Sequence, residues 1–358
     1  MNSESLTILQ QDAIGLLKKL IATPSFSREE EKTRDILKEF FSSKGVKAST
    51  HLNNIWARNK FFDASKPTIL LNSHHDTVRP NKGYTIDPYN PIEKDGKIFG
   101  LGSNDAGGCL VSLIAVFLHY YSSQDLKYNL VIAISAEEEI SGRNGIEALL
   151  PLIGTIEFGI VGEPTQMQMA VAEKGLMVLD CIAHGKAGHA AREEGDNAIT
   201  HAVKDIQWFT NHHFDKISNL LGPVKMTVTV IETDNKAHNI VPSQCKFVVD
   251  TRINELYSFE EILEIVRANT TSEVQARSIR LRSSSIAMDH PLVQAGIRLG
   301  RTCYGSSTTS DKALMHFPAL KIGPGDSARS HTADEYIYIK EIEEGVELYT
   351  LLLNQLLL

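Results

Sequence analysis

Four short apolar runs in this chain lead towards histidine or acidic side chains, and this pattern limits the folds it can adopt. Runs of this length, rich in leucine, isoleucine and valine, predict buried strands of a sheet that is covered on both faces. Helical stretches alternate with them through the first half, so the sequence predicts an α/β sheet whose strand ends carry the functional side chains. The runs span residues 68–72, 130–136, 158–162 and 319–322.

The first run ends in Ser73-His74-His75-Asp76. A strand that ends in His-x-Asp places an imidazole at the rim of the sheet, and the carboxylate two residues later can orient that ring for metal binding. A polar hairpin edge is the alternative for so short a motif.

The glycine-rich segment 100–108 holds a single carboxylate, Asp105, and leads into the apolar stretch 109–121, which predicts a buried helix. Glycines allow close approach of the backbone, and a carboxylate at such a turn can bridge two cations. Asp105 could instead cap the helix.

The other runs add carboxylates and a second histidine. Glu137-Glu138-Glu139 follows the second run directly, and such clustering is unfavourable unless a cation or a shared proton relieves the repulsion. Glu163 follows the third run, where Pro164 biases it towards an extended backbone. His331 lies in the loop after the fourth.

Together these residues offer nitrogen and oxygen ligands without thiolates, a set that suits zinc, with cobalt or manganese as substitutes. Two neighbouring cations lower the pKa of a shared water and polarise a carbonyl, while an uncoordinated glutamate can take the proton. The sequence therefore predicts a two-metal hydrolytic site.

With these motifs, essentially the whole chain resembles the dinuclear zinc amidohydrolases that include acetylornithine deacetylase, succinyl-diaminopimelate desuccinylase, aminoacylase and carboxypeptidase G. The resemblance makes Glu138 the general base. It implies His74 as first-metal histidine, Asp76 as its orienting partner, Asp105 as bridging carboxylate, Glu163 as second ligand of that metal, and Glu139 with His331 as ligands of the other metal.

The chain departs from the family pattern without losing a ligand. Ser73 stands where the family usually has Gly, Ala106-Gly107-Gly108 replaces Met-Lys-Gly, and Glu137 replaces Asp. Three consecutive glutamates leave the register open, so Glu137 and Glu138 are the alternative base and ligand. Ile140-Ser141-Gly142 favours the later pair, because it follows as in the family.

Between Glu163 and His331 the pattern changes to strand, helix, two strands, helix and strand, which is a ferredoxin-like order. We expect catalytic segments at 1–172 and 287–358, with an inserted domain at 173–286. Similar inserted domains in the family act as lids and dimer surfaces, so the resemblance implies a homodimer. The expected elements of the insert are strands at 176–183, 224–232, 245–253 and 278–283, and helices at 197–209 and 259–267.

The resemblance also implies residues that contact substrate. His189, between small residues, matches the histidine that polarises the scissile carbonyl, and Asn239 assists it. Arg252 matches a clamp for the substrate carboxylate, although a structural ion pair is an equal alternative. Ser310, Asp311 and Gly323 resemble segments that line the substrate pocket.

Composition excludes several other classes of protein. A net charge of −8 without a basic block argues against nucleic acid and anionic membranes. No stretch approaches the roughly 20 apolar residues of a membrane span, and residues 8–22 are too polar for a signal sequence. Four widely spaced cysteines favour reduced thiols in a cytoplasm.

The reaction implied is hydrolysis of the amide bond of an N-acyl amino acid, a small-molecule substrate. An N-acetyl or N-succinyl derivative of ornithine or citrulline, from arginine biosynthesis, is the first expectation. Desuccinylation of succinyl-diaminopimelate or deacetylation of N-acetyl-lysine comes second, and a dipeptide third. A metal-binding protein without catalysis is the alternative from another class.

Overall fold

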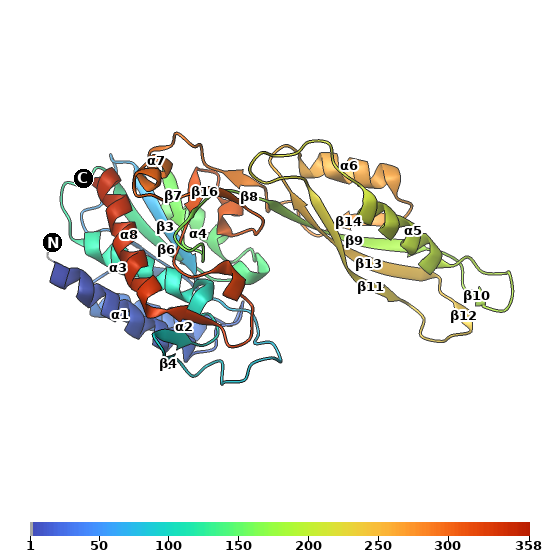
Figure 1. Ribbon diagram of the computed structural model, residues 1–358, viewed down its shortest axis with the longest axis horizontal. Coiled ribbons are helices and arrows are strands. Elements are labelled where there is room, and N and C mark those ends of the chain that lie inside the picture. Colours follow the sequence, from blue (N-terminus) through green and yellow to red (C-terminus); the bar gives the residue numbers. More distant parts are fainter. Residues whose placement is uncertain (1–2) are drawn as a thin grey trace. The chain divides into compact units, whose positions relative to one another are not determined.

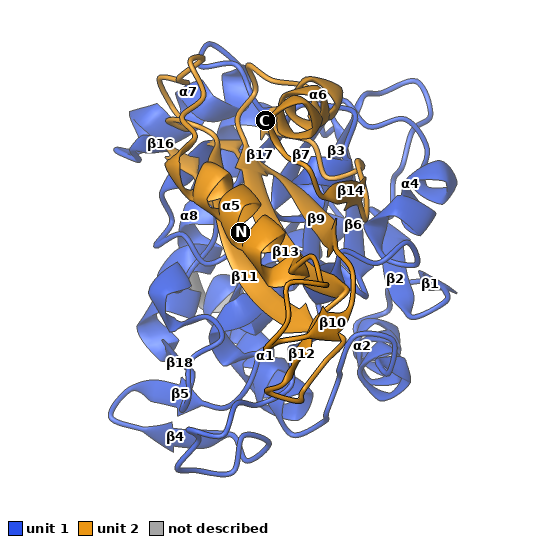
Figure 2. Cartoon of the chain, turned by 90° about the vertical axis from the view of Figure 1, so that its right-hand side faces the viewer, with its two compact units in different colours: residues 1–171, 285–304, 310–358 blue, residues 172–284, 305–309 orange. Residues whose placement is uncertain are grey.

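The computed structural model describes residues 3–358 (Figure 1), with side chains described from Leu6 onward. It divides into two compact units (Figure 2): unit 1 contains the chain up to Val171 together with Ser285–Tyr304 and Ser310–Leu358, and unit 2 contains Ala172–Ser284 and Gly305–Thr309. The expected domain boundaries, at 172/173 and 286/287, lie within two residues of the main unit boundaries. The short segment at 305–309 was not part of that expectation.

Unit 1 is built on a mixed sheet whose central strands run parallel, so the expected α/β class is confirmed. The order of the strands is β1 (Ala48–His51), β2 (Asn54–Arg58), β6 (Asn129–Ser135), β3 (Thr68–His74), β7 (Phe158–Val161), β17 (Ala319–Lys321), β8 (Met169–Glu173) and β15 (Ser284–Ser285), with β16 (Cys303–Ser306) paired to β8. The neighbouring pairs β6–β3, β3–β7 and β7–β17 are parallel, whereas β1–β2, β2–β6 and β17–β8 are antiparallel.

The register of the parallel strands brings their carboxyl ends to one edge of the sheet. His74 at the end of β3 pairs with Ser135 at the end of β6, and Asn72 pairs with Val161 at the end of β7. Val161 in turn pairs with Lys321 at the end of β17. The four loops that follow these strands therefore leave the sheet at the same edge, where α/β proteins place their binding sites.

Helices enclose this sheet. α3 contacts β3 and β6 on one side and α1 and α8 on the other (Figure 1), which explains why its sequence is apolar almost throughout. Phe117 of α3 meets Phe41 of α2 edge to face, and both are fully buried. The helices of unit 1 are α1 (Ser3–Ile21), α2 (Glu31–Ser43), α3 (Gly108–Tyr121), α4 (Ile146–Ile153), α7 (Pro291–Arg298) and α8 (Ile339–Leu357).

The remaining loops of unit 1 contain short strands and turns. A three-stranded sheet joins β4 (Ile92–Lys94), β5 (Lys97–Phe99) and β18 (Tyr336–Tyr338). Single helical turns lie at Ser103–Gly107, Glu138–Ile140, Asp311–Leu314 and Ser327–Arg329.

Unit 2 has the expected order of strands and helices, with a separate ribbon of β10 (Gly188–His189) and β12 (Ile240–Val241). Ser258 and Glu261 form a capping box that fixes the start of α6. The antiparallel sheet has the order β11 (Lys225–Thr233), β13 (Gln244–Ile253), β9 (Gly175–His184) and β14 (Glu273–Ala276), and its helices are α5 (Ala198–Asn211) and α6 (Phe259–Asn269).

The prediction of a strand at 278–283 is wrong, because the last strand of this sheet is β14 at Glu273–Ala276. Val274 is the β14 side chain that packs in the core of unit 2, whereas Ile279 is 43% exposed. The alternation of apolar and polar residues at 278–283 thus does not reflect a half-buried strand.

None of the helices in the described part of the chain is long and apolar enough to cross a membrane. All four cysteines are free thiols.

Candidate metal centre

The first imidazole of the centre belongs to His74, which is 1% exposed at the end of β3. Its Nδ1 lies 3.0 Å from the carbonyl oxygen of Asp76 and 3.4 Å from a carboxylate oxygen of the same residue. Nδ1–H therefore donates to Asp76, which leaves the Nε2 lone pair available to a cation. That Nε2 lies 3.3 Å from Oδ1 of Asp105 and 3.8 Å from Oε1 of Glu163.

The second imidazole belongs to His331, in the loop before β18. Its Nε2 lies 3.0 Å from Oε2 of Glu139 and 3.7 Å from Oδ2 of Asp105. The two carboxylate oxygens of Asp105 are thus directed towards different imidazoles. This is the position that a bridging ligand of two cations must occupy.

These separations fit metal binding. Ligand atoms about 2.0–2.1 Å from a tetrahedral zinc ion lie about 3.3 Å from one another. The distances from the two imidazoles to the carboxylates of Asp105, Glu139 and Glu163 given above run from 3.0 to 3.8 Å. Oxygen and nitrogen donors without sulfur suit a divalent ion of this kind. Donor atoms within 4.8 Å of one another come from His74 with Asp105 and Glu139, and from His74 with Glu138 and Glu163.

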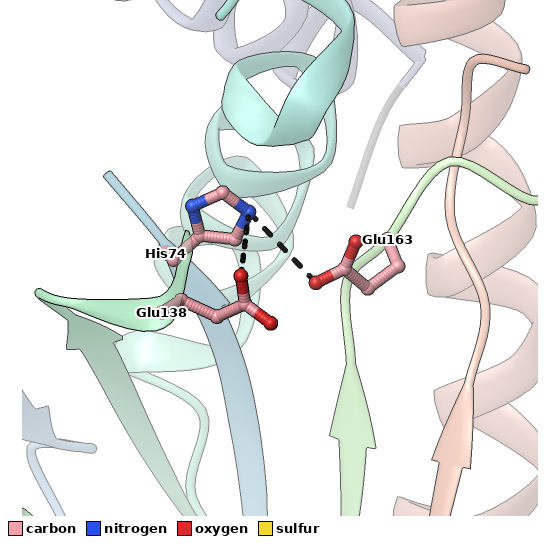
Figure 3. A group of neighbouring side chains, drawn as sticks. All are labelled: His74, Glu138 and Glu163. Atoms are coloured by element: carbon pink, nitrogen blue, oxygen red, sulfur yellow. Dashed lines mark ion pairs between the residues drawn. The ribbon is translucent and has the colours of Figure 1, made fainter. Parts of the chain in front are cut away.

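Glu138 lies beside the first imidazole. Figure 3 shows His74, Glu138 and Glu163 pointing towards one another from the ends of β3, β6 and β7. Oε2 of Glu138 is 3.9 Å from Nε2 of His74, nearly the same distance as Oε1 of Glu163. By distance alone, either glutamate could therefore bind the same cation as His74.

The three consecutive glutamates point in different directions. Glu137, at φ +54°, donates its backbone N–H to Glu30, and its carboxylate accepts from the side chain of Asn144. The carboxylates of Glu138 and Glu139 instead lie beside His74 and His331. This geometry favours the pair Glu138 and Glu139 for the roles of base and ligand.

Asp76 fixes this part of the centre through its two carboxylate oxygens. Oδ1 accepts the backbone N–H of Glu138 at 3.0 Å, and Oδ2 accepts that of Glu139 at 3.1 Å. Ser27 also donates its hydroxyl to Asp76 at 2.6 Å. Asp76 therefore joins the imidazole of His74 to the backbone that carries the next two carboxylates.

The electrostatics of the metal-free centre reflect crowded carboxylates. Burial raises the pKa of Glu138 well above its usual value and also raises that of Glu139. Burial opposes protonation of His74, but hydrogen bonds to Asp105 and Asp76 raise its pKa well above the ordinary range. The hydrogen bond to Glu139 raises the pKa of His331 to about 9. Without cations, this cluster holds protons in their place.

Three residues expected to line the substrate pocket lie at buried positions in unit 1. Ser310 and Asp311 are 4% and 5% exposed, and Asp311 accepts the hydroxyl of Ser135 at 2.5 Å. Burial raises the pKa of Asp311 to about 6. A Cβ at Gly323 would lie 2.6 Å from the backbone oxygen of Glu163, so this glycine allows the two loops to approach. Contact of these residues with substrate remains a prediction.

The other expected substrate contacts belong to unit 2. His189 is exposed on β10, and Asn239 lies next to it, because its carbonyl accepts the backbone N–H of Ala190. Arg252 on β13 makes a bidentate contact with Asp250 at 2.7 and 2.9 Å, so the ion pair considered as its structural alternative is present.

Several buried polar residues around the centre were missed by the sequence analysis. Glu30 and Glu335, at 0% and 2% exposure, accept backbone N–H groups of the segments that carry the candidate ligands. Asn104 is fully buried beside Asp105. Glu335 follows His331 by four residues, and that short spacing was the available signal.

Comparison with known proteins assigns the chain to a family. The sequence profile of peptidase family M20/M25/M40 matches residues 70–355, most of the chain. This protein belongs to peptidase family M20/M25/M40. Family membership confirms the resemblance found in the sequence. Together with the cluster around His74, it identifies this protein as a metal-dependent amide hydrolase with a candidate metal site.

Individual M20 relatives are distant but match along nearly the whole chain. Succinyl-diaminopimelate desuccinylase 2 of Ruegeria sp. is 22% identical over 92% of this chain and 91% of that protein. Succinyl-diaminopimelate desuccinylase of Rickettsia bellii is 24% identical over 93% and 94%. The crystal structure of the M20 metallo-carboxypeptidase Sso-CP2 from Sulfolobus solfataricus superposes with a TM-score of 0.77 at 15% identity, covering 99% of both chains, and shows the shared fold.

We expect metal binding to release protons at neutral pH. His331, with a pKa of about 9, is protonated in the metal-free protein at pH 7, and a coordinating imidazole must be neutral. Calorimetric zinc titration of the metal-free protein should give an apparent enthalpy that changes with the ionisation enthalpy of the buffer. Apparent zinc affinity should weaken as the pH falls from 8 to about 6. An enthalpy that is the same in every buffer would contradict this expectation.

Proposed function

We propose that this protein hydrolyses the amide bond of an N-acyl amino acid with two zinc ions, for which cobalt or manganese can substitute. The observation that supports it best is the carboxylate of Asp105, whose two oxygens are directed towards the imidazoles of His74 and His331. Glu138 lies beside this set and supplies a carboxylate beyond the proposed ligands.

In the proposed centre, His74, Asp105 and Glu163 hold one ion, and Asp105, Glu139 and His331 hold the other. When bound, the two ions lower the pKa of a water and polarise the scissile carbonyl. Asp76 holds the ring of His74 in the tautomer that presents Nε2.

Glu138 acts as general base and then as general acid. Its carboxylate takes a proton from the attacking water and delivers it to the nitrogen of the leaving amine. A buried carboxylate with a raised pKa is suited to both transfers, because it holds a proton more readily than an exposed glutamate does.

We assign the remaining roles to unit 2. His189 polarises the carbonyl oxygen of the substrate with the assistance of Asn239, and Arg252 binds the carboxylate of the amino acid. Asp250 supports the last role, because its bidentate contact fixes the plane of the guanidinium. Unit 2 thereby serves as the lid domain.

We propose N-succinyl-diaminopimelate as the first candidate substrate. Two relatives that match more than nine-tenths of this chain carry the name succinyl-diaminopimelate desuccinylase. N-acetyl-ornithine and N-acetyl-citrulline, the first expectation from the sequence, and N-acetyl-lysine remain in the proposal as alternatives, followed by dipeptides. Four free thiols are consistent with action in the cytoplasm.

A substrate panel tests this proposal. We expect zinc-loaded protein to release free amine from N-succinyl-diaminopimelate, with N-acetyl-ornithine, N-acetyl-citrulline, N-acetyl-lysine and simple dipeptides as competing candidates. Chelator-treated protein is the control, and turnover should return when zinc is restored. Preference for an N-acetyl substrate would overturn the succinyl assignment, and no turnover of any amide would overturn the proposed function.

Replacement of the proposed base should strongly reduce turnover without loss of metal. We expect Glu138→Gln to lower kcat by about 10²–10⁴-fold, because it removes proton transfer. Glu137→Gln is the matched control, since Glu137 points towards Asn144, and its kcat should stay within a few-fold of the wild type. Bound zinc should be measured in both variants by elemental analysis. The reverse order of effects would assign the base to Glu137, and unchanged functions in Glu138→Gln would favour a non-catalytic protein.

We also propose a homodimer that forms through unit 2. β11 is an edge strand of the unit 2 sheet, and Val230 and Ile231 on it are 47% and 53% exposed. Edge strands present backbone groups that can pair with another chain.

Ile231→Lys should therefore shift the protein from dimer to monomer in sedimentation velocity at micromolar concentration. Ile8→Lys, at a 59% exposed position of α1 in unit 1, is the control and should leave the dimer intact. A wild-type protein that sediments as a monomer would contradict the proposal.

A further inference from the structure

Glu335 is a buried carboxylate in unit 1 that belongs to no proposed ligand set, and it accepts three backbone hydrogen bonds. Its Oε1 accepts the N–H groups of Asn104 at 2.8 Å and Asp105 at 2.9 Å, and its Oε2 accepts that of Gly102 at 3.1 Å. Its side chain is directed at the turn that carries the proposed bridging carboxylate. Only 2% of the residue is exposed.

The same turn is tied to the His331 loop at further points. The backbone oxygen of Glu335 accepts the N–H of Gly100. The side-chain oxygen of Asn104 accepts the N–H of Asp326 at 3.0 Å, and its amide nitrogen donates to the carbonyl of Asp326 at 3.0 Å and to the hydroxyl of Ser330 at 3.3 Å. The segments 100–105 and 326–335 are therefore joined by hydrogen bonds at Asp105 and at three of the five residues that precede it.

The turn needs such a partner because its backbone is irregular. Gly102 has φ +75°, and Asp105, with φ −116° and ψ 100°, departs from helical geometry. The N–H groups of residues 102, 104 and 105 consequently lack the regular partners of a helix interior, and Glu335 supplies an acceptor for each. An ionised carboxylate can accept all three, since each of its oxygens has two lone pairs.

We propose that Glu335 is the positioning residue of the bridging carboxylate, which it holds between the two imidazoles by fixing the backbone of Asp105 relative to the His331 segment. This inference rests on the proposed two-metal site. Because Asp105 is shared, displacement of its backbone should weaken the binding of both ions. Glu335 itself belongs to neither proposed ligand set.

Glu335→Gln separates this role from simple packing. The glutamine has nearly the same shape, but it replaces one carboxylate oxygen by an NH₂ group that would face a backbone N–H. We expect zinc affinity to fall at least about tenfold at both positions, measured by competition with a chromophoric chelator. At saturating zinc, kcat should fall and KM should change little.

Asp334→Asn is the matched control. Asp334 is the neighbouring carboxylate and also accepts three hydrogen bonds, from the backbone and hydroxyl of Thr85 and the backbone of Ile86. None of these partners lies in the turn of Asp105, so zinc affinity should stay within two-fold of the wild type. His331→Ala is the comparison for loss of one ion, because it removes a ligand of only one proposed position.

The metal titration needs no substrate, so it can fail or succeed independently of the proposed reaction. A Glu335→Gln variant with lowered thermal stability but unchanged zinc affinity and kcat would overturn the proposal and make Glu335 a purely structural residue. Weakened binding of one ion alone would also overturn it. If Glu335→Gln does not fold, Glu335→Asp keeps the charge on a shorter side chain that cannot reach all three amides, and the same zinc titration decides.

Discussion

Repulsion among carboxylates at one edge of a parallel sheet is the constraint on which the rest of unit 1 depends. Parallel register brings the ends of β3, β6 and β7 together, so Glu138 and Glu163 must lie near His74. The raised pKa of Glu138 reflects the unfavourable burial of a charge there. Cations, or protons in their absence, are what make this arrangement compatible with a folded protein.

A second set of carboxylates, outside the proposed ligand sets, stabilises the loops. The carboxylate of Asp76 accepts hydrogen bonds from the backbone N–H groups of Glu138 and Glu139. In the same way, Glu30 accepts the N–H of Glu137, and Glu335 accepts the N–H of Asp105. Each one supplies acceptors where a ligand-bearing loop leaves regular secondary structure. The geometry of the centre thus depends on two sets of acidic residues, those proposed as metal ligands and those whose carboxylates accept hydrogen bonds from the backbone of the ligand-bearing loops.

The sequence predicted the sheet and the clustered side chains because both leave a local signal. An apolar run followed at once by a histidine or carboxylate identifies a strand end, as it did for His74 and Glu163. The contacts of Glu335 and Asn104 are not marked by an apolar run, since each joins a side chain to a backbone group more than 200 residues away. The misplaced strand at 278–283 has a related cause, because which segment forms the edge strand depends on packing against α6, a contact that the segment's own sequence does not reveal.

Gly323 shows how the close approach of two loops restricts which residues a position can accept. Any side chain there would meet the backbone of Glu163 at 2.6 Å and the sulfur of Cys109 at 2.7 Å. Even the smallest replacement, alanine, would push on the loop that carries a proposed ligand, although Gly323 itself offers no ligand atom. A residue without a reactive side chain can therefore be constrained by the candidate site as the residues that carry its candidate ligands are.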